Sequence, residues 1–270
     1  MGIAEDIADD WHAALAALAW QVELGVDEII GEAALNRYEL PPPPKLPEAA
    51  PLAVPAPAVR IAVEAGPGRQ EILAEAEAAA ARAGTLEELR AEIAGFAHCE
   101  IKQGARNMVF GDGNAKARVL ILGEAPSVEE DREGRPFVGR SGDMLDRMFA
   151  AIGLERGAEA AEAAFYATMV LPWRTPQTRD PSPAEIEMMR PFVARHVALV
   201  DPAVVVLMGN VALLAGTGAT GITAKRGTWL QAFGKPALPM LHPEFLMRMP
   251  LAKREAWADL LTLKARLRAV

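Results

Sequence analysis

The stretch RVLILGEAPSVEEDREGRPFVGRSG, residues 118–142, indicates both the fold and the site of this 270-residue chain. It begins with the apolar run Val119–Leu122, which has the length and composition of a buried strand. A polar loop rich in acids and glycines follows Gly123, and helical spacing of apolar residues begins after Ser141. Open α/β sheets build binding sites in this way at the carboxyl ends of their strands. Because the loop is too long and too acidic for a plain connection, we interpret it as the functional site.

The rest of the chain alternates apolar strand patterns with helical ones. A turn signal at Gly111–Asn114 follows a short extended piece, and Ser182 with Glu185 forms a capping box for a helix that starts at Pro183. Strands are predicted at 118–123, 165–170, 203–208 and 237–241, and helices at 183–199, from 209 onward and at 252–267. This alternation predicts an α/β fold, a three-layer α/β/α sandwich around a short central parallel sheet of about four strands.

Composition divides the chain into regions of different character. We expect an N-terminal helical extension at 1–40, a Pro/Ala-rich linker at 41–68, a helical lead-in at 69–97 and the α/β domain at 98–270. Residues 1–95 carry 17 acidic and 6 basic side chains, whereas residues 96–270 carry 19 acidic and 22 basic ones. The net charge of −8 therefore hides a mildly basic domain, which permits a DNA partner without demanding one.

Composition also excludes several classes of protein. No apolar run reaches the ~18–20 residues of a membrane span, and the start MGIAEDIADD is acidic where a signal peptide is basic. We therefore expect a soluble cytoplasmic protein that does not bind membranes. Cys99 is the only cysteine in the sequence, which excludes an internal disulfide and any metal site built from cysteines alone within one chain.

Three polar motifs each follow a predicted strand: GEAPSVEEDREGRPFVGRSG at 123–142, TMVLPWR at 168–174 and LHPEFLMR at 241–248. Each motif alone is weak, but their order and their positions at strand ends are specific. Together they resemble the uracil-DNA glycosylase superfamily, most closely its family 4 branch, whose motifs read GEAPG, ED, GxPFVGxxG, TN and HPSYLLR. The resemblance covers residues 96–268 and agrees most closely in the first motif.

The resemblance implies an enzyme that flips uracil out of DNA and hydrolyses its N-glycosidic bond. Glu124 stands where the family has the carboxylate that orients water and stabilises positive charge on the sugar. His242 stands where the family has the donor to uracil O2. The implied base-binding residues include the aromatic ring that stacks on the flipped base and its neighbours in the pocket: Phe137, Met169, Ala125 and Ser127.

The resemblance also implies contacts with DNA outside the base pocket. A wedge of three apolar side chains after His242 would fill the gap left in the duplex, and an arginine beside it would approach a phosphate. The helix that begins in the first motif would offer backbone donors to another phosphate. The candidate DNA-binding residues are Gly139, Ser141, Arg174, Phe245, Leu246, Met247 and Arg248.

Each candidate also has a purely structural explanation. Glu124 can cap or solvate a loop, Phe137 can belong to the core, and His242 can be a histidine that forms only structural hydrogen bonds. The apolar residues after His242 can be ordinary packing, and Arg174 can belong to a Pro-rich loop without touching DNA.

The family pattern is broken at the positions of an iron–sulfur cluster. Family 4 members typically bind such a cluster through four cysteines. In this chain Cys99 stands at the second of these positions and Phe96 at the first. One cysteine cannot hold a cluster, so we predict neither an iron–sulfur cluster nor another metal.

The pattern is also broken at Met169, where the family has an asparagine whose amide pairs with the uracil edge. Methionine offers neither a donor nor an acceptor of that strength, and Ser127 replaces the last glycine of GEAPG. Three outcomes follow for the base: residual excision of uracil through backbone contacts, a preference for another deaminated base, or binding of DNA without cleavage.

We predict a monomeric DNA glycosylase of base excision repair that acts on DNA containing uracil or a related deaminated base. The alternative is a catalytically altered or inactive family member that binds uracil-containing or abasic DNA, or a protein partner, without turnover. A nucleotide-binding α/β enzyme ranks below both, because the sequence has no GxGxxG after its first strand and no Walker loop.

Overall fold

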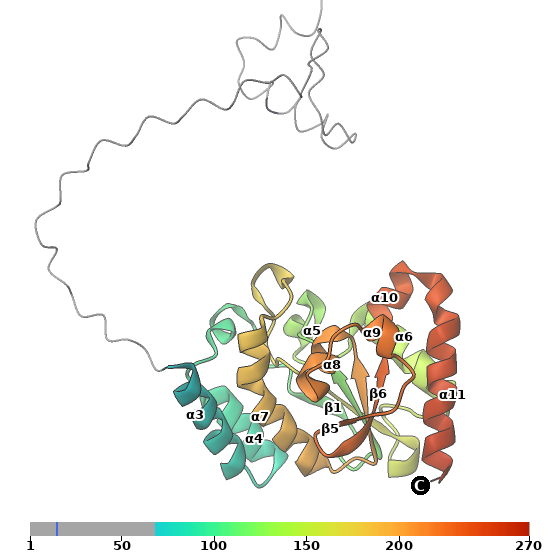
Figure 1. Ribbon diagram of the computed structural model, residues 1–270, viewed down its shortest axis with the longest axis horizontal. Coiled ribbons are helices and arrows are strands. Elements are labelled where there is room, and N and C mark those ends of the chain that lie inside the picture. Colours follow the sequence, from blue (N-terminus) through green and yellow to red (C-terminus); the bar gives the residue numbers. More distant parts are fainter. Residues whose placement is uncertain (1–14, 16–67, 270) are drawn as a thin grey trace, which may run out of the picture. The chain divides into compact units, whose positions relative to one another are not determined.

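The structure, a computed structural model, describes Leu15 and residues 68–269 (Figure 1). The predicted helical extension at 1–40 and the predicted linker at 41–68 lie outside the described residues, apart from Leu15 and Gly68. None of the helices in this described part of the chain is long and apolar enough to cross a membrane.

A six-stranded sheet in the order β1-β3-β2-β4-β6-β5 forms the centre of the domain. The inner four strands are parallel and the short outer two are antiparallel. All residues of β2, β3 and β4 are buried, as expected for a parallel sheet that is covered on both faces. The strands are β1 (Gly111–Gly113), β2 (Val119–Gly123), β3 (Phe165–Met169), β4 (Val204–Met208), β5 (Leu230–Ala232) and β6 (Lys235–Met240). The predicted α/β class and parallel sheet are confirmed.

The turn predicted at Gly111–Asn114 is wrong, because its first three residues form the edge strand β1. A Cβ atom at Gly111 would lie 2.1 Å from the hydroxyl oxygen of Tyr166 on β3. Glycine is therefore needed there for close packing on the neighbouring strand rather than for a turn. The turn follows β1 at residues 114–117, where the Ala117 N–H donates to the Asn114 carbonyl at 2.9 Å.

Helices cover both faces of the sheet (Figure 1). On one face α7 packs against α8, with α3 and α4 outside α7, and on the other face α11 packs against α6 and β6. The longer helices are α3 (Arg69–Arg82), α4 (Leu86–Gly95), α6 (Gly139–Ala150), α7 (Pro183–Val200), α8 (Asn210–Thr217) and α11 (Lys253–Ala269). The short ones are α5 (Val128–Glu133), α9 (Ile222–Lys225), α10 (Pro243–Arg248) and the 3-10 turns η1 (Glu100–Gly104), η2 (Ala161–Ala163), η3 (Pro176–Thr178) and η4 (Pro250–Ala252).

The first-motif loop is not a loop throughout, because α5 lies inside it. The Ser127 hydroxyl accepts from the Glu130 N–H at 3.3 Å, and the Glu130 carboxylate accepts from the Ser127 N–H at 2.7 Å. This capping box starts α5, and Gly134 ends it in the left-handed conformation with φ 69°. The Ser-x-x-Glu spacing at 127–130 is the signal for α5 in the sequence. The prediction of a loop that continues from Gly123 to Ser141 is therefore wrong. The next helix, α6, begins at Gly139 rather than after Ser141.

The chain order places a crevice beside β2. From β2 the chain passes to β3 on one side and then to β4 on the other, so the strand order reverses between β2 and β4. The connections that leave the carboxyl ends of the two strands run in opposite directions at such a point, which is where open α/β sheets bind ligands.

Candidate functional site

A pocket of about 570 Å³ opens at the carboxyl ends of the strands. Its wall combines the start of the first motif, the first turn of α6, the segment 175–181 and the start of α10. Six of the predicted site residues line it: Glu124, Ala125, Ser127, Ser141, His242 and Met247. The structure thus brings the first and third motifs together in one cavity, as their positions at strand ends predict.

Glu124 follows β2 and contacts the start of α8. Its Oε1 accepts a hydrogen bond from the Val211 N–H at 2.9 Å, so the carboxylate caps that helix while it lines the pocket. The helix approaches this closely because residue 209 is a glycine with φ 96°, and a Cβ there would lie 2.5 Å from the Glu124 carboxyl carbon. Burial raises the pKa of Glu124 above its ordinary value, the Val211 N–H opposes this shift, and the charge of Asp180 adds to it.

His242 caps the start of α10 and is neutral at physiological pH. Its burial, together with the charge of Arg248, lowers its pKa to about 4. The Nδ1 atom accepts a hydrogen bond from the Glu244 N–H at 3.3 Å, so the proton of the neutral ring is on Nε2. The geometry therefore supplies a neutral N–H donor that lines the same pocket as Glu124.

Phe137 and Met169 lie behind the wall of this pocket rather than in it. Phe137 is only 1% exposed, and its ring stacks on that of His242 with centroids 5.7 Å apart. Met169 is 5% exposed. Both side chains pack over the end of β2, where a Cβ at Gly123 would lie 2.5 Å from the Met169 sulfur and 2.7 Å from Phe137 Cζ. The structure places Phe137 against His242 and near Met169, and it agrees with the explanation that Phe137 is a core residue in the base-free state.

Leu246 of the predicted apolar wedge is completely buried in the DNA-free structure, and its contact with DNA stays a prediction. Successive residues of an α-helix are ~100° apart, so three consecutive side chains of α10 cannot all face DNA. Phe245 and Met247 are partly exposed and Arg248 is exposed. The exposed apolar side chains of this region come later, in the turn after α10: Met249 at 53% and Leu251 at 91%.

Gly139 and Ser141, two of the residues predicted to contact DNA, lie in the first turn of α6. Gly139 has φ 69°, and a Cβ there would overlap a carboxylate oxygen of Glu129, so this carboxylate lies beside the helix start. The Ser141 hydroxyl donates to the Val138 carbonyl at 3.5 Å. Arg140, which the sequence analysis missed, is exposed and lines the pocket next to these residues.

Arg174 joins two loops of the protein. Its Nε donates to Oδ2 of Asp131 at 3.3 Å. Asp131 is buried and also accepts the N–H groups of Arg106 and Asn107, at 2.8 and 3.1 Å. This arrangement agrees with the structural explanation of Arg174, and its contact with DNA stays a prediction.

The segment 175–181 forms part of the pocket wall, whereas the sequence indicates only a Pro-rich loop there. Gln177 and Thr178 both have the left-handed conformation, with φ 55° and 52°. The Thr175 hydroxyl closes the turn by donating to the Arg179 carbonyl at 2.5 Å. Consecutive non-glycine residues in the left-handed conformation, when they line a pocket, often mark a functional loop. The Thr-Pro and Asp-Pro pairs at 175–176 and 180–181 are its signal in the sequence.

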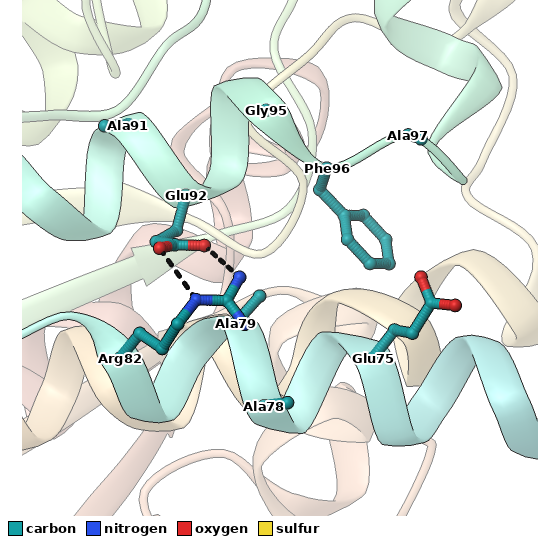
Figure 2. Close-up of a pocket in the computed structure, with 9 residues that line it drawn as sticks. All are labelled: Glu75, Ala78, Ala79, Arg82, Ala91, Glu92, Gly95, Phe96 and Ala97. Atoms are coloured by element: carbon teal, nitrogen blue, oxygen red, sulfur yellow. Dashed lines mark hydrogen bonds and ion pairs between the residues drawn. The ribbon is translucent and has the colours of Figure 1, made fainter.

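The positions that the family uses for an iron–sulfur cluster are filled by packed side chains. Phe96 is buried, and its ring lies 5.2 Å from that of Phe192 in an edge-on contact. A groove of about 450 Å³ lies between α3 and α4 beside Phe96. Figure 2 shows Phe96 at this groove and the Arg82–Glu92 ion pair that spans it. Cys99 is fully buried, and burial raises its pKa to about 11.

These residues do not fit a cluster. They offer one protonated thiol and a phenyl ring where four thiolates are required. No three His, Cys, Asp or Glu side chains within residues 68–269 are grouped so that they could hold a metal ion.

Comparison with known proteins agrees with the motifs. The sequence model described as the uracil DNA glycosylase superfamily matches residues 110–261. The Type-4 uracil-DNA glycosylase of Archaeoglobus fulgidus is 32% identical over 184 residues, 65% of this chain and 89% of that protein. The protein of the same name from Thermotoga maritima is 34% identical over 155 residues, 56% of this chain and 77% of that protein. The one from Sulfurisphaera tokodaii is 36% identical over 127 residues, 47% of this chain and 55% of that protein.

Proposed function

We propose that this chain, which belongs to the uracil DNA glycosylase superfamily, is a DNA glycosylase that hydrolyses the N-glycosidic bond of uracil in DNA. The observation that carries the proposal is the convergence of Glu124 and neutral His242 on one pocket from two separate strand ends. The relatives are named for an enzyme activity, which favours an active glycosylase over the alternative of a member that binds DNA without turnover.

The two side chains match the charges that develop during hydrolysis. When the bond between C1′ and N1 breaks, its electron pair goes to the base, and positive charge develops on the sugar. His242 Nε2–H would donate to uracil O2 as negative charge builds there. Ionised Glu124 would stabilise the sugar and orient the water whose oxygen bonds to C1′, and it would accept the proton that this water loses.

A base reaches Phe137 only after a side chain moves. The ring is only 1% exposed, His242 stacks on it, and the Met169 sulfur lies near it over the end of β2. His242 is held by the Glu244 N–H, whereas the Met169 thioether is held by packing alone and has three rotatable bonds. We infer that Met169 gives way when the base enters and that residue 169 influences which deaminated base is accepted.

The wider setting is inferred from the sequence. The division into an extension at 1–40, a linker at 41–68, a lead-in at 69–97 and a catalytic domain at 98–270 is part of the proposal. We also propose a monomer that acts in base excision repair in the cytoplasm, without an iron–sulfur cluster.

The direct test is an excision assay. Oligonucleotides that contain uracil, hypoxanthine or xanthine, as single and double strands, are incubated with the protein and then treated with alkali to cleave abasic sites. We expect product on uracil, and no product on any of the substrates would contradict the proposal.

Two variants locate the chemistry. Glu124→Ala and His242→Ala should each lower the rate by about 10²–10³-fold, the usual effect of removing a group that stabilises transition-state charge. Glu162→Ala is the matched control for the carboxylate, because Glu162 is exposed and precedes β3 at the other end of the sheet. His98→Ala is the control for the imidazole, because His98 contacts Glu75 outside the pocket. Unchanged rates in the first pair would place the chemistry elsewhere.

A further inference from the structure

The peptide unit of Phe137 is held at both ends by charged side chains. Its N–H donates to Oε1 of Glu130 at 2.5 Å, and its carbonyl accepts from Nη2 of Arg156 at 2.9 Å. Arg156 Nη1 also donates to the carbonyl of Pro136 at 2.8 Å. Hydrogen bonds to charged groups are stronger than neutral ones. Arg156 therefore fixes the carbonyl groups of two consecutive residues of the first motif, which lie 20 and 19 positions before it in the sequence.

Arg156 is itself fixed in orientation. Its guanidinium contacts Asp146 at 2.9 Å and Asp112 at 3.1 Å, and it lies over the ring of Phe165 at 5.4 Å from the centroid. The side chain is 16% exposed. A planar group that satisfies two carboxylates and two carbonyls at once has little freedom, and a lysine cannot reproduce this geometry.

The backbone of Phe137 needs such support. It has φ 50°, a left-handed conformation that costs a non-glycine residue about 1–2 kcal/mol. Helix α6 packs closely against the same carbonyl, since a Cβ at Gly142 would lie 1.9 Å from the Phe137 oxygen. Conformations of this kind persist where the surrounding structure fixes them, and they concentrate at functional sites.

We propose that Arg156 is a positioning residue that keeps the ring of Phe137 in place against His242 while a base enters the site. The inference rests on the proposed function. Because the ring is anchored through its backbone, the side chain that moves is Met169, and the base meets a platform of fixed position. Arg156 acts through Phe137 and does not touch the substrate.

The test separates contacts with the base from contacts with the DNA backbone. Three quantities are measured: kcat/KM on uracil-containing DNA, the Ki of free uracil, and the Kd of an oligonucleotide with a tetrahydrofuran abasic analogue, which has no base. Arg156→Lys should lower kcat/KM and raise the Ki of uracil by about tenfold each, because stacking of a base on an aromatic ring is worth about 1–3 kcal/mol. The Kd of the abasic analogue should stay within about twofold.

The control is Arg135→Ala. Arg135 has the same charge and also lies close to Asp112, but it contacts Glu133 instead of the two carbonyls. It should change none of the three quantities.

Several outcomes would overturn the inference. An unchanged Ki of uracil in Arg156→Lys, or an equal loss of affinity for uracil and for the abasic analogue, would contradict it. Arg156→Ala should behave like Arg156→Lys with a larger loss, and if it does not fold, the lysine variant decides. A wild-type protein without activity on uracil would instead contradict the proposed function, so the two failures are distinguishable.

Discussion

The loops that follow β2 and β3 leave neighbouring strands at the same edge of the sheet, but they are held in different ways. The loop after β2 is fixed by buried carboxylates that accept backbone N–H groups, those of Glu130 and Asp131. β3 ends at Met169, whose thioether is held by packing, and the loop after it passes through Gln177 and Thr178 in the left-handed conformation.

The difference indicates a division of labour. Charge-assisted hydrogen bonds to backbone groups fix positions closely, whereas packing of a flexible thioether allows movement. We therefore expect the loop after β2 to determine the geometry of catalysis and the loop after β3 to determine which base is tolerated. Four predictions test this contrast.

The largest effect is expected from Glu130→Ala in the loop after β2. This change leaves the part-buried N–H group of Ser127 and the buried N–H group of Phe137 without their acceptor. Each unsatisfied group costs about 1–3 kcal/mol, so the free energy of unfolding should fall by about 2–4 kcal/mol. Chemical denaturation measures it, with the more exposed Glu133→Ala as the control. A loss no larger than that of the control would show that the carboxylate does not hold this loop.

The second prediction concerns Met169→Asn at the end of β3, where the second loop starts. An amide at this position can pair with the uracil edge, and two hydrogen bonds of about 0.5–1.5 kcal/mol each correspond to about a tenfold gain in kcat/KM for uracil over hypoxanthine. Met169→Leu is the control, because it keeps an apolar side chain of similar volume. Equal selectivity in the two variants would remove residue 169 from base recognition.

A smaller effect is expected at Gln177. Glycine adopts its φ of 55° without the steric cost that other residues carry, so Gln177→Gly should raise the free energy of unfolding by about 0.5–1 kcal/mol. The variant Gln177→Ala loses the same side chain and keeps the steric cost, so it should not be stabilised. Thermal denaturation of both compares them. Equal stabilisation of both variants would mean that the side chain, and not the backbone conformation, is responsible.

The smallest effect is expected from Asp180→Asn, which tests whether the two loops are coupled electrostatically. The charge of Asp180 raises the pKa of Glu124, so Asp180→Asn should lower that pKa. Because ionised Glu124 is the active form, activity falls as pH drops through its pKa, and the acid side of the pH profile should move to lower pH. Asp143→Asn on α6 is the control, since that charge is not among the causes of the Glu124 shift. An identical acid limb in both variants would show that the loops are not coupled electrostatically.

Much of the fold follows from local signals in the sequence. The capping box predicted at Ser182–Glu185 is present, and the predicted strands agree with the structure to within two residues at each end. The helix predicted at 183–199 is α7, which extends one residue further. Capping and periodicity involve residues within one or two turns of each other, so a single sequence contains them.

The finer structure of the site was less predictable. Arg156 binds carbonyl groups, which every residue carries, so no sequence pattern marks its partners. Leu246 stands inside a motif that points to the site, but the rotation of α10 buries it. The packing of Met169 against Phe137 depends on the absence of a side chain at Gly123, which is recognised only when the strands are placed.

The single thiol offers a practical consequence. Cys99 is buried and stays protonated at neutral pH, and such thiols react slowly with alkylating reagents. Leu251, 91% exposed in the turn after α10, can be changed to cysteine to give the one readily alkylated position. A fluorophore attached there would respond to the approach of DNA with little background from the native cysteine. The chain therefore requires no removal of cysteines before spectroscopic labelling.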